Sequence, residues 1–386
     1  MKVGTFFSGV GSPEQALRNL DIKHEIEFAC DIDKYAKQTY LKNFKPKLFA
    51  EDITTLDMKN LPYVDLLVFG FPCQAFSMAG KRKGFDDTRG TLFYDALRYL
   101  KEHKPRYFIA ENVKGLLSHD NSKTFQTIID CLAKTTNYQM SLMPFENLDY
   151  HIHYKVLNTK DFGIPQNRER IFIIGIRDDE DNNFNFPKEI PLELKLKDIL
   201  QDNVNKKYYL SEEQYKKINI SNETKGLELR KDNLANSITT HEHDSILWIA
   251  DYRTDEGLRI RKDNNSPCLT AGNRANSTGS TPVPIISKTN RVIEKIGKIN
   301  NSQSGAIYSD KGLSTTLSAN GGGQGAKTGL YKTNNRIRRL TPIECERLQG
   351  FPDNFTEEVS DTQRYKQMGN TISVPVIQAI IKKLIG

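Results

Sequence analysis

The sequence has few of the features that mark membrane, secreted or disulfide-bonded proteins. No apolar run approaches the ~18 residues that a membrane-spanning helix needs, and the first residues, 1–5, form no charged and apolar leader. The 386 residues include five cysteines, an odd number without a C-x-x-C pair. These absences argue against a membrane protein, a disulfide framework and a cysteine zinc site, and they predict a protein of the reducing cytoplasm.

Metal ligands are also few. Two His-x-His pairs occur, at 151–153 and 241–243, and neither has Cys or carboxylate partners at a metal-site spacing. No bound metal is therefore expected.

The length and the change of composition along the chain predict two domains. A chain of 386 residues is too long for one compact core of ordinary size. After residue 187 the sequence becomes polar and rich in Asn and Lys, and three similar segments, 227–240, 258–270 and 306–318, predict short hairpins. We expect a first domain over 1–187, completed by 368–386, and a smaller β-rich domain over 188–367.

The net charge of +7 is unevenly distributed. From residue 288 to 339 ten basic residues accompany two acidic ones, in a segment rich in Gly, Asn, Ser and Thr. Such a stretch is typical of a surface that follows nucleic-acid phosphates. An ordinary solvated surface is the alternative.

The first half of the chain predicts a parallel sheet with polar groups at the ends of its strands. The strand over 2–7 leads into a Gly-containing turn, 8–12, and then a helix with Ser12 as its cap and Pro13 in its first turn. Asp31 follows the second strand, 25–30, where an acidic residue accepts hydrogen bonds from ribose hydroxyls. Asp33 is expected to cap the next helix, and Asp52 with Ile53 to hold an adenine ring.

A cysteine follows the next strand. The apolar run 64–69 is a buried strand, and Gly70 and Pro72 end it, so Cys73 lies just past its carboxyl end. Ligands bind at that edge of open α/β sheets, which suggests a nucleophilic thiol. A buried, inert cysteine is the alternative.

Three further features accompany Cys73. Glu111 ends another strand and is placed to act as an acid, because an apolar site raises a carboxyl pKa. Arg168 and Arg170 share one face of a strand, where they meet either an electronegative ligand or a structural ion-pair partner. The basic segment 80–90 has glycines at both ends, as a lid has, or it is an ordinary exposed loop.

Together these motifs resemble the DNA (cytosine-5) methyltransferase family, of the bacterial and phage restriction-modification type. The match runs through both ends of the chain in order, and Ser12 departs from the glycine that the family often has. The residues that carry it are Phe7-Ser8-Gly9-Val10-Gly11, Gly70-Phe71-Pro72-Cys73-Gln74, Glu111-Asn112-Val113, Gln166-Asn167-Arg168-Glu169-Arg170, the run from Arg338 to Pro352, and Gly369-Asn370-Thr371-Ile372-Ser373-Val374-Pro375.

The resemblance implies an α/β, Rossmann-like S-adenosylmethionine-dependent methyltransferase sheet with a second, smaller β-rich target-recognition domain and hinge over 188–367. It implies transfer of a methyl group from S-adenosylmethionine to carbon 5 of cytosine in double-stranded DNA, through a Cys73 adduct on a flipped-out base. Catalytic roles fall to Cys73, Glu111, Arg168 and Arg170. Cofactor contacts fall to Phe7, Ser8, Gly9, Gly11, Asp31, Ile32, Asp52, Ile53, Gly70, Pro72, Leu92, Asn370 and Thr371, and DNA contacts to Ser77, Lys81, Arg82 and Arg89.

The same resemblance suggests a cytoplasmic monomer and a restriction endonuclease that acts on the same site. Two alternatives stay open. One is an RNA cytosine-5 methyltransferase on the same scaffold, which the long 188–367 insertion disfavours. The other is a DNA-binding regulator without activity, which the intact set of Cys73, Glu111 and Arg170 disfavours.

Overall fold

The computed structural model forms two compact units, which we describe separately. Unit 1 comprises Met1–Leu192, Thr316–Asn320 and Pro342–Gly386, and unit 2 comprises Glu193–Thr315 and Gly321–Thr341. The residues described are 1–72, 92–136, 139–140, 148–211, 218–219, 249–253, 257–261, 293, 295–299, 306–319, 328–333 and 336–386. Outside them lie the predicted nucleophile and loop, the predicted DNA contacts and the first predicted hairpin, which are Cys73, 80–90, Ser77, Lys81, Arg82, Arg89 and 227–240.

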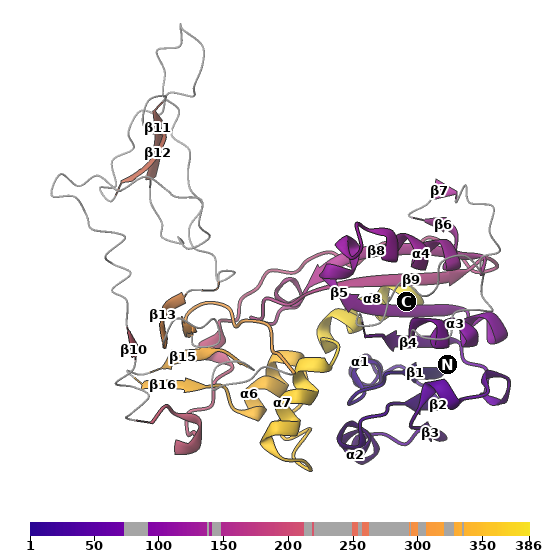
Figure 1. The fold of residues 1–386 in the computed structure, drawn as a ribbon, viewed down its shortest axis with the longest axis horizontal. Helices are drawn as coiled ribbons and strands as arrows, with labels where there is room; N and C mark the ends of the chain where they lie inside the picture. The colour runs from indigo at the N-terminus through magenta and orange to yellow at the C-terminus, as the bar shows by residue number, and fades with distance from the viewer. Residues whose placement is uncertain are drawn as a thin grey trace, which may run out of the picture. The chain divides into compact units, whose positions relative to one another are not determined.

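Unit 1 is built on one mixed sheet whose nine described strands run in the order β3-β2-β1-β4-β5-β9-β8-β6-β7 (Figure 1). The pairs from β3 to β5 are all parallel, whereas β9 is antiparallel to both of its neighbours. The strands are β1 Lys2–Phe6, β2 Glu25–Cys30, β3 Leu48–Ala50, β4 Leu66–Gly70, β5 Tyr107–Val113, β6 Ala133–Thr136, β7 Gln139–Met140, β8 Tyr150–Asn158 and β9 Glu169–Arg177. The predicted α/β, Rossmann-like fold is confirmed.

The strand order reverses between β1 and β4, so the chain leaves these two neighbouring strands in opposite directions. In doubly wound sheets ligands bind at this switch point, beyond the carboxyl ends of the strands. The helices of unit 1 are α1 Ser12–Asn19, α2 Lys34–Asn43, α3 Leu92–His103, α4 Lys123–Leu132, α6 Pro342–Gln349, α7 Asp361–Asn370 and α8 Val374–Ile385, with short 3-10 helices η1 Ile53–Thr55, η2 Met58–Asn60, η6 Lys114–Ser118 and η7 Thr159–Phe162.

Apolar side chains of the strands and of α3 and α4 form one continuous core. The sequence Leu66–Gly70 is buried over its first four residues, as expected for a strand covered on both faces. Aromatic rings of β1, β2 and α3 meet edge-on or tilted, with centroids 5.1 Å apart for Phe6–Phe28 and 5.5 Å apart for Phe6–Tyr99. This packing holds β1 and β2 against α3.

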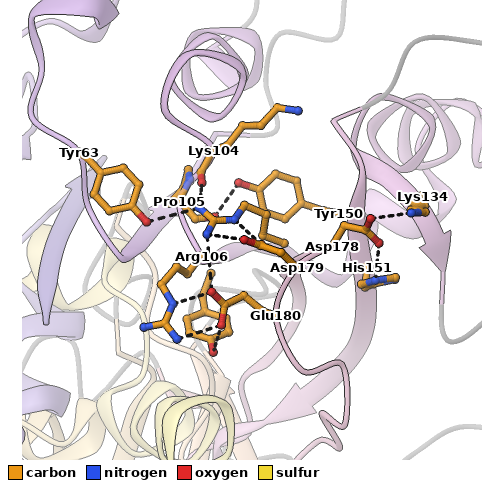
Figure 2. Close-up of polar contacts among 12 residues, drawn as sticks. Tyr63, Lys104, Pro105, Arg106, Lys134, Tyr150, His151, Asp178, Asp179 and Glu180 are labelled. Atoms are coloured by element: carbon orange, nitrogen blue, oxygen red, sulfur yellow. Dashed lines mark hydrogen bonds and ion pairs between the residues drawn. The ribbon is translucent and has the colours of Figure 1, made fainter.

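Ion pairs join the strands at the end of the sheet that lies away from the switch point (Figure 2). Arg106, just before β5, pairs with Glu180 at 2.7 Å, and Arg177 at the end of β9 pairs with Asp179 at 2.6 Å. A second group joins Asp178 to Lys134 at 2.6 Å and to His151 at 3.0 Å. These contacts tie the start of β5 to the end of β9.

The C-terminal segment returns to the first half of the chain. Lys42 of α2 pairs with Glu357 at 2.8 Å, and the Asn43 side chain donates to the Phe355 carbonyl at 3.1 Å. Unit 1 therefore includes 342–367, whereas the boundary drawn from sequence gives these residues to the second domain. The difference arises because α7 and the segment before it have their own polar contacts with α2, which composition does not reveal.

Unit 2 contains a sheet with the order β10-β13-β14-β15-β16 and a separate β11–β12 hairpin. One prediction here is wrong: the segment 306–318 is not a hairpin, because β14 pairs with β13 and β15 rather than with 314–318. The elements are η8 Leu196–Asp198, η9 Lys206–Tyr208, β10 Ile218–Asn219, β11 Ile249–Arg253, β12 Gly257–Arg261, β13 Lys295–Ile299, β14 Ala306–Ser309, β15 Leu330–Thr333 and β16 Arg336–Arg339.

The described residues contain neither a membrane-spanning helix nor a metal-binding cluster. No helix among them has the length and apolar character needed to cross a bilayer. No group of three or more His, Cys, Asp and Glu side chains in the same part of the chain is arranged to hold a metal ion.

Candidate active site

A cavity of about 310 Å³ lies at the switch point of the unit 1 sheet. A smaller cavity of about 30 Å³ adjoins it, with shared walls at the ends of β1, β4 and β5. Among the predicted site residues, those that line the larger cavity are Phe7, Gly9, Asp31, Gly70, Pro72, Glu111, Arg168, Arg170 and Asn370, and Ser8 and Thr371 line the smaller one.

The turn between β1 and α1 forms one wall. Phe7 has a φ of 53°, in the left-handed region that is uncommon for residues other than glycine. Gly9, with a φ of 55°, follows, and a Cβ atom at Gly9 would have no atom within 4 Å. The turn therefore exposes bare backbone to the cavity, which allows close approach of a ligand.

Buried hydrogen bonds support this turn from behind. The Ser8 hydroxyl is 2.8 Å from the Thr5 hydroxyl and accepts from the Cys30 amide at 2.9 Å. Gly11 does not line either cavity. Its φ is 90°, and a Cβ atom there would lie 2.4 Å from the Phe44 ring, so packing accounts for this glycine.

Ser12 does not cap α1 as predicted. The residue before the helix is Gly11, and Ser12 is the first helical residue, with no capping hydrogen bond from its side chain. Its hydroxyl instead lies against the Thr371 hydroxyl, which belongs to the opposite end of the chain. Pro13 is in the first helical turn, as predicted.

Asp31 holds the turn after β2 to the turn after β1. Its Oδ2 accepts from the Gly9 amide at 2.7 Å, and its Oδ1 accepts from the Asp33 amide at 2.8 Å. Burial raises the pKa of Asp31, and the two amides partly offset this. Each carboxylate oxygen keeps a second lone pair for a ligand hydroxyl.

Asp33 caps α2, as predicted. Its Oδ1 accepts from the amides of Tyr35 at 2.9 Å and Ala36 at 3.2 Å. Its Oδ2 accepts from Lys366 at 2.6 Å. Burial alone would raise the pKa of Asp33, but Lys366 and the amides hold it below its ordinary value.

Four other predicted cofactor residues line neither cavity. Asp52 caps η1 through the Thr54 amide at 2.9 Å, and Ile53 is 4% exposed in the core. Leu92 begins α3 and packs against the same core. Ile32 is 77% exposed. Their cofactor roles stay predictions.

The chain leaves β4 through Gly70, Phe71 and Pro72. The buried Asn112 side chain donates to the Phe71 carbonyl at 2.9 Å and accepts from the Val113 amide at 2.8 Å. Asn112 thus fixes the backbone two residues before Cys73 from the neighbouring strand β5. The sequence analysis did not assign it a role.

Glu111 and Arg170 form an ion pair at the edge of the cavity. Arg170 Nε is 3.1 Å from Glu111 Oε1, and their side chains are 18% and 11% exposed. The register explains the contact, because β5 pairs with β9 so that Glu111 lies opposite Phe172. Burial raises the pKa of Glu111, and the charges of Arg170 and Arg168 oppose that change. A carboxyl in this setting can carry a proton closer to neutral pH.

Arg168 is 2% exposed and holds the C-terminal segment. Its Nη2 donates to the carbonyls of Gly369 at 3.1 Å and Thr371 at 2.7 Å. Its Nε and Nη1 have no hydrogen-bond partner among the described residues. Burial lowers the pKa of Arg168 to about 9, so it keeps its charge at neutral pH.

The last turn of α7 supplies Asn370, and the backbone there is enclosed. A Cβ atom on Gly369 would lie 2.4 Å from the Ala319 amide nitrogen, so only glycine fits. Sequence reasoning missed several lining residues: Val10, Ala36, Phe71, Asn112, Val113, Lys366, Gln367 and Gly369. The polar pair Lys366 and Gln367, just before Gly369-Asn370, was the available signal.

These walls suit an adenosine-type ligand. Bare backbone at Gly9 and open acceptor sites on Asp31 match ribose hydroxyls. The Glu111–Arg170 pair matches a second, polar ligand that both donates and accepts.

Comparisons with known proteins agree with this geometry. The sequence model of one family, described as C-5 cytosine-specific DNA methylase, matches residues 1–386. The chain is 36% identical to the Type II methyltransferase M.HhaI of Haemophilus parahaemolyticus, over 97% of this chain and 91% of that protein. It is 34% identical to the orphan methyltransferase M.SPRI of Bacillus phage SPR, over 100% and 97%.

Solved structures share the fold. A DNMT2 variant of Spodoptera frugiperda superimposes with a TM-score of 0.61 at 16% identity, over 100% of this chain and 99% of that one. A putative DNA modification methyltransferase from a prophage of E. coli gives 0.56 at 21% identity, over 100% and 98%.

Proposed function

The chain belongs to the C-5 cytosine-specific DNA methylase family, and on that premise we propose that it methylates one cytosine of a specific site in double-stranded DNA, through a covalent Cys73 adduct on a flipped-out base. It is a DNA (cytosine-5) methyltransferase, and S-adenosylmethionine is the methyl donor of the family. The observation that supports the finer proposal most is the buried Glu111–Arg170 pair in the same cavity as the Asp31 turn.

The cofactor would be held by the turns after β1 and β2 and by the segment around Asn370. Gly9 offers backbone, Asp31 offers free acceptor sites to ribose hydroxyls, and Arg168 holds the carbonyls on both sides of the lining residue Asn370. When bound, S-adenosylmethionine supplies an electrophilic methyl group. The exposed Ile32 side chain is a candidate cover for the adenine ring.

Carbon 5 of cytosine is a weak nucleophile, and the protein has to activate it. In the proposed mechanism the Cys73 thiolate bonds to ring carbon 6, and Glu111 donates a proton to the ring nitrogen at position 3. Arg170, which is paired with Glu111, holds the exocyclic oxygen. After methylation carbon 5 loses its proton to a base, the carbon–sulfur bond breaks, and Cys73 leaves as the thiolate. The ring nitrogen at position 3 returns its proton to Glu111.

We propose a positioning role for Arg168 in place of the catalytic role that the family resemblance implies. Its burial and its two carbonyl partners support the role of a positioning residue.

The substrate itself has to leave the duplex to enter such a cavity. We propose that 80–90 closes over the flipped base and that Ser77, Lys81, Arg82 and Arg89 contact DNA.

We also propose a target-recognition role for unit 2, a monomeric state and a cytoplasmic site of action. A partner restriction endonuclease is proposed because relatives such as M.HhaI are named Type II methyltransferases.

One experiment tests the proposal and its RNA alternative together. The chain and its Cys73→Ser variant are expressed in a host without cytosine methylation, and host DNA and transfer RNA are both sequenced after bisulfite treatment. We expect protection of one cytosine within one DNA sequence, lost in the variant. Protection confined to RNA would establish the alternative, and equal DNA protection in the variant would contradict the Cys73 mechanism.

A further inference from the structure

A lysine near the C-terminus and an aspartate near the N-terminus meet at the cofactor side of the cavity. Lys366 of α7 and Asp33 both line the cavity, and their charged atoms are 2.6 Å apart across 333 residues of sequence. The two side chains are 39% and 23% exposed. The contact is therefore partly shielded from solvent at the wall of the cavity.

The ion pair is the end of a series of contacts that reaches the glycine turn. Asp33 donates its amide to Asp31 at 2.8 Å, and the other oxygen of Asp31 accepts from Gly9 at 2.7 Å. The Asp33 side chain is held in turn by Lys366. The Lys366 ammonium on α7 therefore influences the orientation of the Asp31 carboxylate, which faces the proposed ribose position.

The residue after Lys366 strengthens this connection. The Gln367 side chain donates to the Tyr35 carbonyl at 2.8 Å and accepts from the Thr39 hydroxyl at 3.2 Å. Two adjacent residues of α7 therefore hold the first turns of α2, directly beside Asp31.

We propose that Lys366 is a positioning residue for the methyl donor, which acts by holding Asp33 and, through it, the Asp31 carboxylate in the orientation that accepts the ribose hydroxyls. The inference rests on the proposed use of this cavity for S-adenosylmethionine.

The charges around Asp31 also support this role of Lys366. Burial raises the pKa of Asp31 and the negative charge of Asp33 adds to that effect, whereas the charge of Lys366 opposes both. Without Lys366, two carboxylates would face each other across one turn with less compensation. Of the neighbouring groups, Cys30 has its pKa raised to about 12 by burial and by Asp31 and Asp52, so it stays a neutral thiol.

The chain offers a matched control in Lys42. It joins α2 to the same C-terminal segment, through Glu357 at 2.8 Å and Glu358 at 2.5 Å, with a side chain that is 32% exposed. It does not line the cavity. A loss that comes only from weaker attachment of the C-terminal segment should therefore appear equally in Lys42 and Lys366 variants.

The test is equilibrium dialysis with radiolabelled S-adenosylmethionine on the full chain and on Lys366→Met, Lys366→Arg and Lys42→Met. Urea unfolding of each protein is measured alongside. We expect the dissociation constant to rise about fivefold to tenfold in Lys366→Met, from loss of one partly shielded ion pair and the orientation it maintains. Lys366→Arg should restore binding to within about threefold of the unchanged chain, and Lys42→Met should bind normally.

The outcomes separate this inference from the proposed function. If the unchanged chain binds the cofactor and Lys366→Met binds it equally well, the inference is overturned while the proposed function stands. Equal weakening in Lys42→Met, or no recovery with arginine, also overturns it. If the unchanged chain does not bind S-adenosylmethionine, the assignment of the cavity fails and the inference fails with it.

Discussion

Arg168 and Thr371 are 203 residues apart in sequence, yet the Arg168 guanidinium donates a 2.7 Å hydrogen bond to the Thr371 carbonyl. The same nitrogen contacts the Gly369 carbonyl, so one buried arginine holds both sides of Asn370. The cavity consequently depends on the last 20 or so residues of the chain as much as on the first parallel strands, a design that single-core α/β domains allow because their termini lie at the surface.

Replacement of Arg168 by lysine should open this side of the cavity. Lysine is a point donor without the planar fork, and a buried ammonium in its place would keep poor contacts to two carbonyls. We expect a loss of roughly 2–4 kcal/mol in the free energy of unfolding and at least about tenfold weaker S-adenosylmethionine binding. Urea unfolding and equilibrium dialysis measure these effects.

The control for Arg168 is Arg98→Lys. Arg98 also donates to two carbonyls, of Leu56 and Ile53, each at 3.3 Å, but it is partly exposed and away from the cavity. Normal cofactor binding is expected there. Unchanged binding in Arg168→Lys as well would show that the carbonyl contacts do not shape the site.

Gly369→Ala should be more damaging than an alanine replacement normally is. The added Cβ would meet the Ala319 backbone nitrogen at 2.4 Å, and backbone cannot rotate away as a side chain can. A loss of about 1–3 kcal/mol in the free energy of unfolding is expected. Gly115→Ala, where a Cβ has no atom within 4 Å, is the control and should unfold like the unchanged chain.

Asn112→Ala should slow the chemical step without weakening cofactor binding. Its amide holds the Phe71 carbonyl, two residues before the proposed nucleophile, and removal of that bond leaves a buried carbonyl unpaired. We expect kcat to fall roughly tenfold or more, with an unchanged dissociation constant for S-adenosylmethionine. Asn185→Ala, at an exposed position, serves as the control, and a fall in cofactor affinity in Asn112→Ala would argue against this role.

Glu111 and Glu180 should affect stability in opposite pH ranges. The pKa of Glu111 is raised by burial, so the folded state binds its proton more tightly than the unfolded state, whose pKa is 4.5. The contribution of Glu111 to the free energy of unfolding is fully present below pH 4.5. It is lost as pH rises through the pKa of Glu111 in the folded state. The free energy of unfolding of the unchanged chain should therefore fall, relative to Glu111→Gln, as pH rises above 4.5.

The control variant is Glu180→Gln. The pKa of Glu180 is lowered, first by its hydrogen bond with Arg106, so its contribution is present above pH 4.5 and is lost as pH falls below that value. Urea unfolding of the three proteins between pH 3 and 8 measures both trends. A difference for Glu111→Gln that stays constant above pH 4.5 would contradict a raised pKa.

Local patterns in the sequence predicted much of unit 1. The strand over 25–30 has the bounds expected, because it has a clear period and clear ends. The family was also predicted correctly from its motifs. Of the predicted site residues, Phe7, Ser8, Gly9, Asp31, Gly70, Pro72 and Glu111, all at or near the strand ends of β1, β2, β4 and β5, line the cavities, since parallel strands bring their carboxyl ends to one edge.

Contacts between distant parts of the chain could not be predicted in this way. Nothing near Arg168 indicates that its partners are carbonyls more than 200 residues away. From the sequence, Lys366 is expected to be an ordinary lysine of an amphipathic helix, and Ser12 is expected to cap a helix. In the structure Lys366 pairs with Asp33, and the Ser12 hydroxyl contacts Thr371. The turn residues of the segment 306–318 predict a hairpin. In the structure β14 pairs with the neighbouring strands β13 and β15 instead.

The most direct test of the account is covalent trapping by duplex DNA that carries 5-fluorocytosine at the methylated position. Fluorine at carbon 5 cannot leave as a proton does, so the carbon–sulfur bond persists after methylation. In the presence of S-adenosylmethionine we expect a denaturation-resistant complex with the unchanged chain, with the DNA attached to Cys73 in the mass spectrum of the digested protein. Attachment at another residue, or an equal yield of complex with Cys73→Ser, would contradict the account.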